Sequence, residues 1–196
     1  NNNYDFIKIF QLKDEISFEN LMKAAKKFGM GVCGHYPSYI ESKKSKVIDF
    51  KTLLESGYKS IEHLGGYSAI ENKEKLKELI RLTKVNNVYN CPTLDFFNTD
   101  LGLKYPNEYI NKLSYSQTPN SIKKKWDEAL KEREKDTSRI SIALVKKKYG
   151  HEYKRKIEVL KMLYDSNCLL LLGGDAGGLY QPEGLNVYDE MKHWQE

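Results

Sequence analysis

Apolar and polar residues follow two different periods along this chain. Short runs rich in β-branched and aromatic residues place neighbouring side chains on opposite faces, whereas longer segments repeat their apolar residues every three or four positions. The short runs predict strands and the longer segments predict amphipathic helices. The predicted strands are residues 4–10, 32–35, 59–63, 87–92 and 168–172, and the predicted helices are residues 17–28, 49–57, 71–84, 121–135 and 152–166.

Capping residues support these boundaries. Ser17 is the predicted N-cap of the first helix and Gly29 ends it, while Asp49 and Gly57 play the same parts for the second helix. Strands and helices alternate four times with short connections, which predicts an α/β fold with a parallel sheet. The last predicted strand, Cys168 to Leu172, is apolar throughout, as expected of a parallel strand covered on both faces.

One connection is much longer than the others. Residues 95–150 separate the fourth strand from the helix at 152–166, and long loops inside compact domains are usually lids or disordered segments. This insertion contains helical periodicity and the apolar anchors Trp126 and Leu130. We therefore expect one domain over residues 1–196 with an ordered, lid-like helical insertion at 95–150.

Composition narrows the function classes. The chain has 196 residues, of which 40% are hydrophobic and 30% charged, and a net charge of +5. The lysines are scattered along predicted helices and partly balanced by glutamates, a pattern typical of solvated faces rather than of a nucleic-acid-binding stripe. No apolar run approaches membrane-spanning length. We expect neither nucleic acid nor membrane as a partner, and the localisation stays open. The odd number of cysteines in apolar runs predicts free thiols; they are Cys33, Cys91 and Cys168.

Two histidines carry the first chemical signal. His35 and His63 each end a predicted strand, and the segment between them is long enough for one crossover helix. In a parallel sheet such a unit brings both strand ends to the same edge, so the two imidazoles should converge there. Convergent imidazoles indicate a metal site or an acid–base site. Taken singly, either histidine could equally be a hydrogen-bonded core residue.

Lys8 and Asp175 are the candidate partners, each with a plain alternative. Lys8 lies within an apolar strand, so its amine either reaches the rim or has a depressed pKa. In the second case it can take up carbon dioxide and become an anionic carbamate that bridges two metal ions. Asp175 follows a predicted buried strand in the glycine-rich run 173–178. It is either a functional carboxylate or a turn residue that accepts bonds from backbone amides, and a phosphate-binding glycine loop is a weaker third option.

Together these four residues form a more specific pattern than any one of them. Lys8, His35, His63 and Asp175 are each predicted at the carboxyl end of a separate parallel strand. In a β/α barrel that end is the catalytic face.

The motifs IKI, GHYP, IEHLGGY and GGDAG, in this order, resemble the metal-dependent amidohydrolase superfamily. The similarity is greatest to the branch that includes imidazolonepropionase-like enzymes and Xaa-Pro dipeptidases. It extends over most of the chain, because the run CPTL at 91–94, the tryptophan-bearing insertion and GLNVYDEM at 184–191 also resemble that branch.

The resemblance implies a partial (β/α)8 TIM barrel, in which the strands here correspond to the fourth to eighth and the insertion lies between strand 7 and its helix. It implies that Lys8 is the carboxylated bridging lysine and that His35 and His63 bind one metal. Asp175 would bind the other metal and act as the general base. Gly174 stands where the family more often has threonine.

The chain also departs from the family pattern. The His-x-His pair of the family's first strand has no counterpart here, nor do the first three strands. A five-stranded piece of a barrel has two unpaired edges, which natural proteins avoid. We therefore expect a domain that is incomplete at both ends, completed by further chain segments or by an oligomer.

These features predict a metal-dependent hydrolase of C–N bonds in amides, dipeptides or cyclic amides. A small amide or peptide would be the substrate, and one or two divalent ions would activate water, with zinc favoured because neutral imidazoles suit it. The alternative is a noncatalytic remnant or fragment that acts as a binding module.

Two tyrosines are candidate substrate contacts. Tyr67 follows His63 closely and is a candidate hydrogen-bond donor to the substrate or to the developing oxyanion, or else a rim residue that packs on the lid. Tyr36, directly after His35, is a candidate for lining the pocket.

Overall fold

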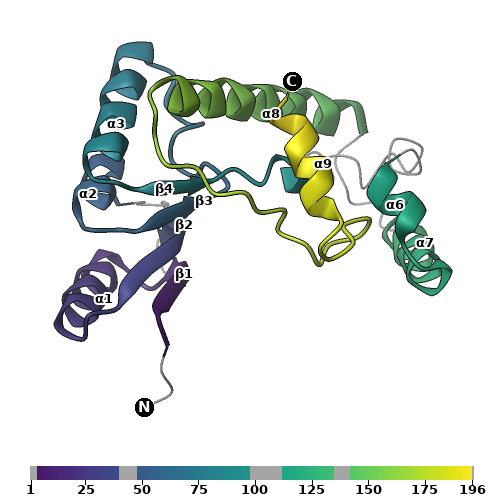
Figure 1. Cartoon of the computed structure of the whole chain (residues 1–196), viewed down its shortest axis with the longest axis horizontal. Coiled ribbons are helices and arrows are strands. Elements are labelled where there is room, and N and C mark those ends of the chain that lie inside the picture. Colours follow the sequence, from purple (N-terminus) through teal and green to yellow (C-terminus); the bar gives the residue numbers. More distant parts are fainter. Residues whose placement is uncertain (1–3, 40–47, 98–111, 135–141, 196) are drawn as a thin grey trace. The chain divides into compact units, whose positions relative to one another are not determined.

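The computed structural model describes residues 4–39, 48–97, 112–134 and 142–195 (Figure 1). These residues form two compact units. The first unit contains Asn1–Pro92 and Glu158–Leu171, and the second contains Thr93–Ile157 and Leu172–Glu196. Within the described part of the chain, the helices are too short or too polar to cross a membrane.

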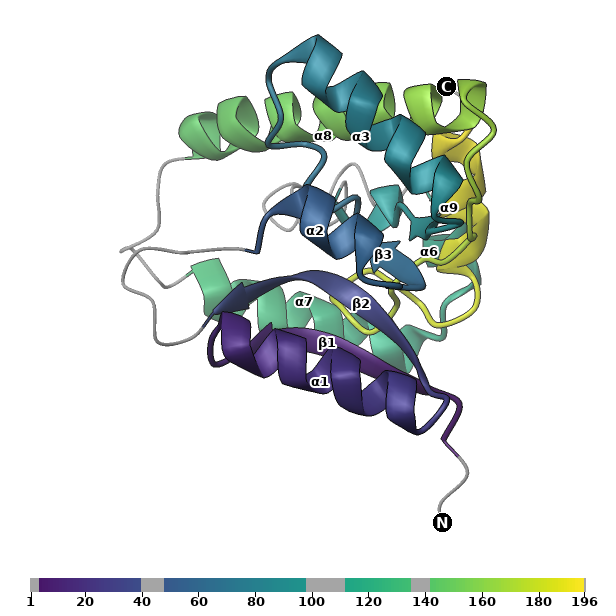
Figure 2. The same ribbon diagram turned by 90° about the vertical axis from the view of Figure 1, so that its left-hand side faces the viewer.

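The first unit is built on a parallel sheet in which the strands lie side by side in chain order. Helices connect successive strands, and Figure 2 shows the helix α1 alongside β1 and β2. The predicted α/β class with a parallel sheet is therefore confirmed, whereas its identity as part of a barrel stays a prediction. The strands are β1 (Phe6–Leu12), β2 (Gly31–Tyr39), β3 (Ser60–Glu62) and β4 (Tyr89–Cys91), and the helices are α1 (Glu15–Lys27), α2 (Phe50–Glu55) and α3 (Lys73–Val85).

Side-chain caps begin the helices of this unit. The Asp14 carboxylate accepts a hydrogen bond of 2.8 Å from the backbone N of Ser17, so α1 begins earlier than predicted and Asp14, not Ser17, is its N-cap. The prediction for Asp49 is confirmed, because its carboxylate accepts from the backbone N of Thr52 at 3.2 Å. Each cap satisfies an amide that has no partner within its own helix.

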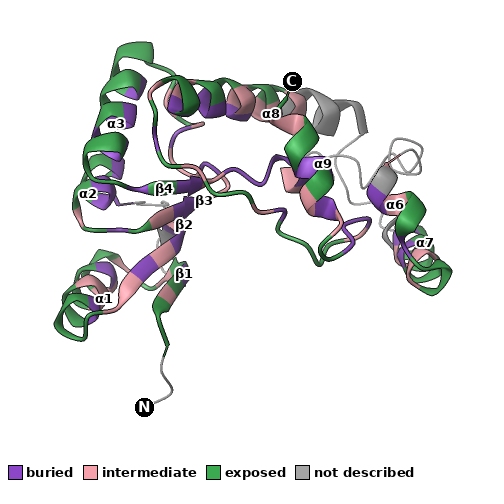
Figure 3. Ribbon diagram, viewed as in Figure 1, coloured by how far each residue is buried: buried purple, intermediate pink, exposed green. Residues whose placement is uncertain are grey.

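The core of the first unit lies between β3 and the apolar faces of α2 and α3. Figure 3 shows buried positions along β2, β3 and one side of α3. Removing this apolar surface from water is the main stabilising contribution. Among the side chains without measurable exposure are Leu53, Leu54, Ile61, Leu64, Tyr67 and Leu76.

Gly34 allows β1 and β2 to approach each other closely. Its φ is +121°, and a Cβ atom built on it would lie 2.3 Å from the backbone oxygen of Ile9. The register between the two strands shifts between Ile9 and Gln11, which is where the chain adjusts to this contact. Only glycine fits here without moving the backbone of the neighbouring strand.

The fifth predicted strand is present only as a single bridge. Leu170 pairs in parallel with Asn90, and the backbone N of Leu171 donates to the Asn90 oxygen at 2.8 Å. Leu169 and Leu171 are 38% and 41% exposed, so the prediction of a strand covered on both faces is wrong. In the described part of the chain the pairing does not continue beyond this bridge, and both leucine side chains are exposed to solvent.

The second unit is helical. The division between the units falls within α8, after Ile157, and α8 begins ten residues before the predicted helix at 152–166. Trp126 and Leu130, the two anchors noted in the sequence, are buried against Tyr180. The role of this segment as a lid stays a prediction. The helices are α6 (Leu113–Gln117), α7 (Asn120–Glu134), α8 (Ile142–Asp165) and α9 (Asn186–His193).

A network of buried polar groups holds residue 95 in the second unit. The Asp95 carboxylate is fully buried and accepts from Lys112 and, at 3.4 Å, from Nε2 of His193. Its backbone N donates to the Glu190 carboxylate at 2.7 Å. Burial raises the pKa of Asp95, but the bonds and charges of His193 and Lys112 outweigh it and lower the pKa. Burial raises the pKa of Glu190 instead.

Lys156 is an unusual cation in this unit because its side chain is almost completely buried, with 2% exposed. Its Nζ lies 3.8 Å from the centroid of the Phe97 ring. Burial lowers the pKa of Lys156 to about 8, and the charge of Glu152 opposes this shift only in part.

We expect Gly34→Ala to destabilise the protein by about 2–4 kcal/mol, because the residue must keep a positive φ and its Cβ would collide with the Ile9 backbone. Urea unfolding followed by circular dichroism measures this change. Gly150→Ala is the control: Gly150 is helical and a Cβ there meets no heavy atom within 4 Å, so alanine should stabilise by about 0.5–1 kcal/mol. Equal stability of the Gly34→Ala variant and the unmodified chain would contradict the close approach.

We expect Lys156→Met to stabilise the protein at pH 7 by about 1–3 kcal/mol. The folded pKa of about 8 lies below the ordinary value of 10.5, so the unfolded chain binds the additional proton between these values. The stability of the unmodified chain should therefore rise with pH between about 8 and 10.5, and this rise should vanish in the variant. Urea midpoints across this pH range measure the effect, with the exposed Lys154→Met as control.

Candidate metal centre

The structure brings His35 and His63 into direct contact. Their Nε2 atoms are 3.1 Å apart, and the two rings meet edge to face with centroids 4.7 Å apart. The parallel register of β2 and β3, in which Cys33 pairs with Ser60 and Gly34 with Ile61, brings the ends of this pairing side by side, and a left-handed turn at His63 completes the contact. The convergence expected from the sequence is therefore present in the first unit.

His35 lies within β2 rather than at its predicted end. β2 continues to Tyr39, but its pairing with β3 stops at Gly34, so His35 is the first residue beyond that pairing. The Tyr58 hydroxyl donates to the His35 carbonyl oxygen at 2.9 Å, and the Phe10 ring lies against the imidazole with centroids 4.5 Å apart. Burial raises the pKa of Tyr58 far above its ordinary value, which keeps this hydroxyl a neutral donor.

His63 is positioned by a sharp change of backbone direction. β3 ends at Glu62, and His63 has a φ of 61° in the left-handed region, which is uncommon for residues other than glycine. Its backbone N donates to the Cys91 oxygen at 2.8 Å, so the neighbouring strand β4 holds the turn in place.

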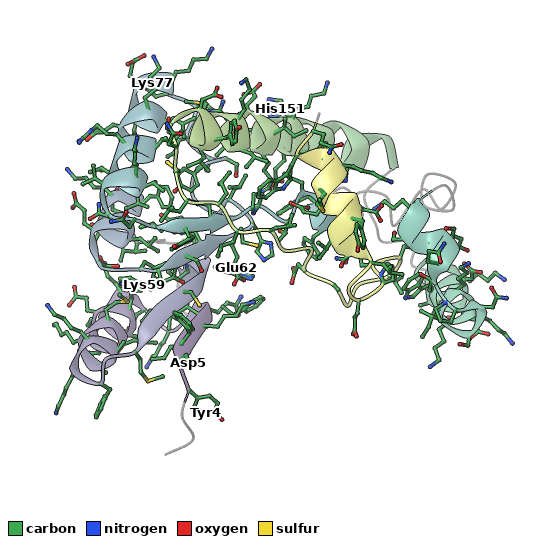
Figure 4. All side chains as sticks on the ribbon, viewed as in Figure 1. Tyr4, Asp5, Lys59, Glu62, Lys77 and His151 are labelled. Carbon is green, nitrogen blue, oxygen red and sulfur yellow. The ribbon has the colours of Figure 1, made fainter. Side chains whose placement is uncertain are left out.

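Glu62 joins the two histidines and was not foreseen from the sequence. One carboxylate oxygen of Glu62 and one ring nitrogen of each histidine all lie within 4.8 Å of one another. Figure 4 labels Lys59, the residue before β3, and Glu62, the last residue of β3. Successive strand residues point to opposite faces, so alternation alone would separate Glu62 from His63. The left-handed backbone conformation at His63 changes the direction of its side chain, so that the imidazole lies near the Glu62 carboxylate.

Lys8 reaches the same cluster through Glu62. Its Nζ lies 2.8 Å from a Glu62 carboxylate oxygen, and 56% of the Lys8 side chain is exposed. The amine is therefore at the rim, as one of the two sequence-based alternatives predicts. An ion pair at this exposure contributes at most about 1 kcal/mol to stability, so its main effect is to orient the Glu62 carboxylate.

The donor set fits a divalent metal ion. Two imidazole nitrogens and a carboxylate oxygen are ligands that zinc accepts, and two zinc–nitrogen bonds of about 2.0–2.1 Å at a tetrahedral angle separate the nitrogens by about 3.3 Å. The distance of 3.1 Å between the histidine nitrogens is close to that separation. Cys33 is a poor additional ligand, because burial and then the charge of Glu62 raise the pKa of its thiol. All three cysteines are free, as predicted.

Asp175 belongs to the second unit, and its meeting with the histidines stays a prediction. It is exposed and has a φ of 48°. The preceding carbonyl, of Gly174, accepts a hydrogen bond of 2.7 Å from the Asn186 side chain of α9. A Cβ on Gly174 would lie 2.3 Å from that side-chain nitrogen, so a larger residue such as threonine would not fit here without a shift of Asn186.

Tyr67 and Tyr36 both have their hydroxyls engaged within the fold. Tyr67 is completely buried, and its hydroxyl shares a hydrogen bond of 2.7 Å with the Thr83 side chain. The Tyr36 hydroxyl donates to the Ile48 carbonyl, and its ring meets Phe50 edge to face. These contacts hold Ile48 and the segment after β3 against the core, and a role of either tyrosine as a substrate contact stays a prediction.

The fold resembles that of two solved hydrolases. A bottromycin amidohydrolase superimposes with a TM-score of 0.66 and 19% sequence identity, over 98% of this chain and 42% of the other. A Xaa-Pro dipeptidase, solved with methionine bound in its active site, superimposes with a TM-score of 0.52 and 18% identity, over 98% and 39%. The chain thus spans about two fifths of the length of these proteins. No protein-family model matches the sequence, and no curated protein is significantly similar to it. The likeness therefore shows a shared amidohydrolase-type fold.

We expect the chain to bind zinc at the His35–His63 pair. His35→Ala and His63→Ala should each weaken zinc binding by more than the roughly 10–100-fold that loss of an outer-shell partner costs. Isothermal titration calorimetry measures the affinity. The exposed His151, labelled in Figure 4, supplies the control variant His151→Ala, which should bind zinc like the unmodified chain. Unchanged affinity after removal of either His35 or His63 would contradict the site.

Proposed function

We propose that this chain carries part of the catalytic centre of a metal-dependent hydrolase that cleaves C–N bonds in amides, dipeptides or cyclic amides. The observation that carries the proposal is the contact between the His35 and His63 nitrogens, with a Glu62 oxygen beside them at the edge of a parallel sheet. The amidohydrolase-type fold of the two similar structures supports it.

The proposed roles begin with the imidazoles. His35 and His63 hold one divalent ion through their neutral ring nitrogens, and zinc is the ion that we favour. When bound, such an ion lowers the pKa of a coordinated water to about 7 and polarises the carbonyl of the substrate. Tyr58, by binding the His35 carbonyl, fixes the backbone from which that imidazole projects.

Lys8 enters the proposal as a carbamate. The Lys8 ammonium would first lose one proton, and the neutral amine would then form a bond to the carbon of carbon dioxide and lose a second proton. The two steps together convert a cation into an anion. The ion pair with Glu62 would then become a repulsion between two anions, so Glu62 must either turn away or use its charge on the bound cation. We propose that Glu62 binds the cation, because its oxygen already lies within 4.8 Å of both histidine nitrogens.

Asp175 is the proposed general base. Its carboxylate would accept the proton of the attacking water and deliver it to the leaving nitrogen, which must be protonated before an amide can expel it. Asn186 holds the Gly174 carbonyl directly before Asp175, which supports a fixed backbone from which the carboxylate projects.

We expect Asp175→Asn in the complete protein to lower kcat by at least about a hundredfold, because the asparagine cannot accept the proton. The assay is the release of amines from a panel of N-acetylated amino acid amides and dipeptides, with the metal content of each preparation measured in parallel. Asp165→Asn is the control, since Asp165 is exposed and pairs with Lys161 of the same helix. The kcat of this variant should stay within twofold.

Two results would count against the proposal. Full activity of the Asp175→Asn variant would remove Asp175 from the mechanism. Zinc-loaded complete protein that releases no amine from any member of the panel would favour the noncatalytic binding module instead.

A further inference from the structure

The second unit contains a cavity that the proposed chemistry does not use. Its volume is about 390 Å³, within the size range of small-molecule sites. It lies between the start of α7 and the segment that follows Asp175. Gly177 and Gly178, two and three residues beyond that aspartate, are among the residues that line it. Every residue that lines the cavity belongs to the second unit.

Most of the wall is apolar. Ile122 and Trp126 of α7 contribute one side, and Pro119, Pro182 and Leu185 contribute further hydrocarbon surface. Trp126 also packs against Tyr180 in the hydrophobic cluster of this unit, so its indole is held in place before any ligand arrives. A rigid aromatic wall favours a flat or aliphatic group as the occupant.

Gln181 supplies a polar feature that points to a ligand. It lines the cavity and is only 3% exposed, and its side-chain Nε2 has no hydrogen-bond partner among the described residues. A buried donor left unpaired costs about 1–3 kcal/mol. Gly178 lies against the other end of the same amide, since a Cβ there would meet Oε1 at 2.3 Å. The glycine therefore leaves room for this amide beside the cavity. Because Nε2 itself is buried, a ligand oxygen could bond to its N–H groups once the Gln181 side chain turns toward the cavity.

Charge at the cavity narrows the ligand class. Glu183 lines the cavity and is exposed, and its carboxylate opposes the entry of another anion. The N–H groups of Gln181 require a hydrogen-bond acceptor, and the walls require an apolar body. These three requirements together describe a neutral apolar group that carries a carbonyl oxygen, as an amide does.

We propose that this cavity binds the neutral carbonyl-bearing apolar portion of an amide ligand, with Gln181 as hydrogen-bond donor, Trp126 as packing surface and Glu183 as the residue that discriminates against carboxylates. Its assignment as a substrate pocket rests on the proposed hydrolase function. Binding itself does not, so the test below measures binding without activity.

Benzamide is the probe, because it joins an aromatic ring to a neutral carbonyl. The chain contains only two tryptophans, Trp126 and Trp194, so a nitrogen-15 spectrum resolves their indole N–H signals, assigned with Trp194→Phe. Titration with benzamide should shift the Trp126 signal and leave that of Trp194 unchanged, since the Trp194 indole donates to Glu190 instead of lining the cavity.

Two variants test the polar contacts. Gln181→Leu keeps the size of the side chain but removes the donor, and it should weaken benzamide binding about tenfold, whereas the exposed Gln195→Leu should leave it unchanged. Glu183→Gln removes only an exposed charge, so it should fold normally. It should improve benzoate binding at least about threefold while benzamide binding stays the same.

The outcomes separate the possibilities. Loss of benzamide binding in Gln181→Leu together with improved benzoate binding in Glu183→Gln supports the pocket, even where the complete protein shows no hydrolase activity. No shift of the Trp126 signal would mean that water alone satisfies Gln181, and the proposal would fall. It would also fall if Gln181→Leu bound benzamide like the unmodified chain. Should Gln181→Leu not fold, an unchanged benzoate-to-benzamide ratio in Glu183→Gln overturns it.

Discussion

The parallel register between β2 and β3 is the constraint on which the candidate centre depends. Parallel neighbours lie about 4.8 Å apart, so the residues that follow the last paired positions necessarily face the same small volume. Pairing of Gly34 with Ile61 therefore places His35 beside Glu62, and the left-handed turn at His63 brings the second imidazole to the same place. The close contact of Gly34 with the β1 backbone holds β1 beside β2. From β1, Lys8 reaches Glu62.

Two groups of buried polar side chains in the second unit differ in their surroundings. Around Asp95, the side chains of Lys112 and His193 bond to one carboxylate oxygen and Glu190 accepts from the backbone, and these bonds stabilise one arrangement of the helices. The second carboxylate oxygen of Asp95 has no hydrogen-bond partner among the described residues. Around Gln181 the amide N–H groups have no partner among the described residues, and a cavity lies beside them. The bonds around Asp95 indicate a structural role, whereas the cavity beside the unpaired Gln181 amide is the basis of the proposed binding role.

The likeness to an amidohydrolase and a dipeptidase concerns architecture, and chemistry must be argued from the residues. Here the residues provide two imidazoles, a carboxylate and an amine on three adjacent strands of the first unit. They do not include the His-x-His pair of the family pattern. A centre with His35, His63 and Glu62 as its donors is the part of the proposed chemistry that this chain can supply by its own folding.

The sequence by itself determined the local structure and much of the chemistry. Periodicity predicted α3, a short polar side chain predicted the cap at Asp49, and the alternation of strands and helices predicted that His35 and His63 converge. Only the tertiary structure decided the contribution of Glu62 and the pairing of Lys8, because both depend on a left-handed turn at His63 and on contacts between distant strands. It also decided that residues 168–172 pair at a single bridge, since an apolar run specifies that a strand is favourable but not how far its neighbour continues.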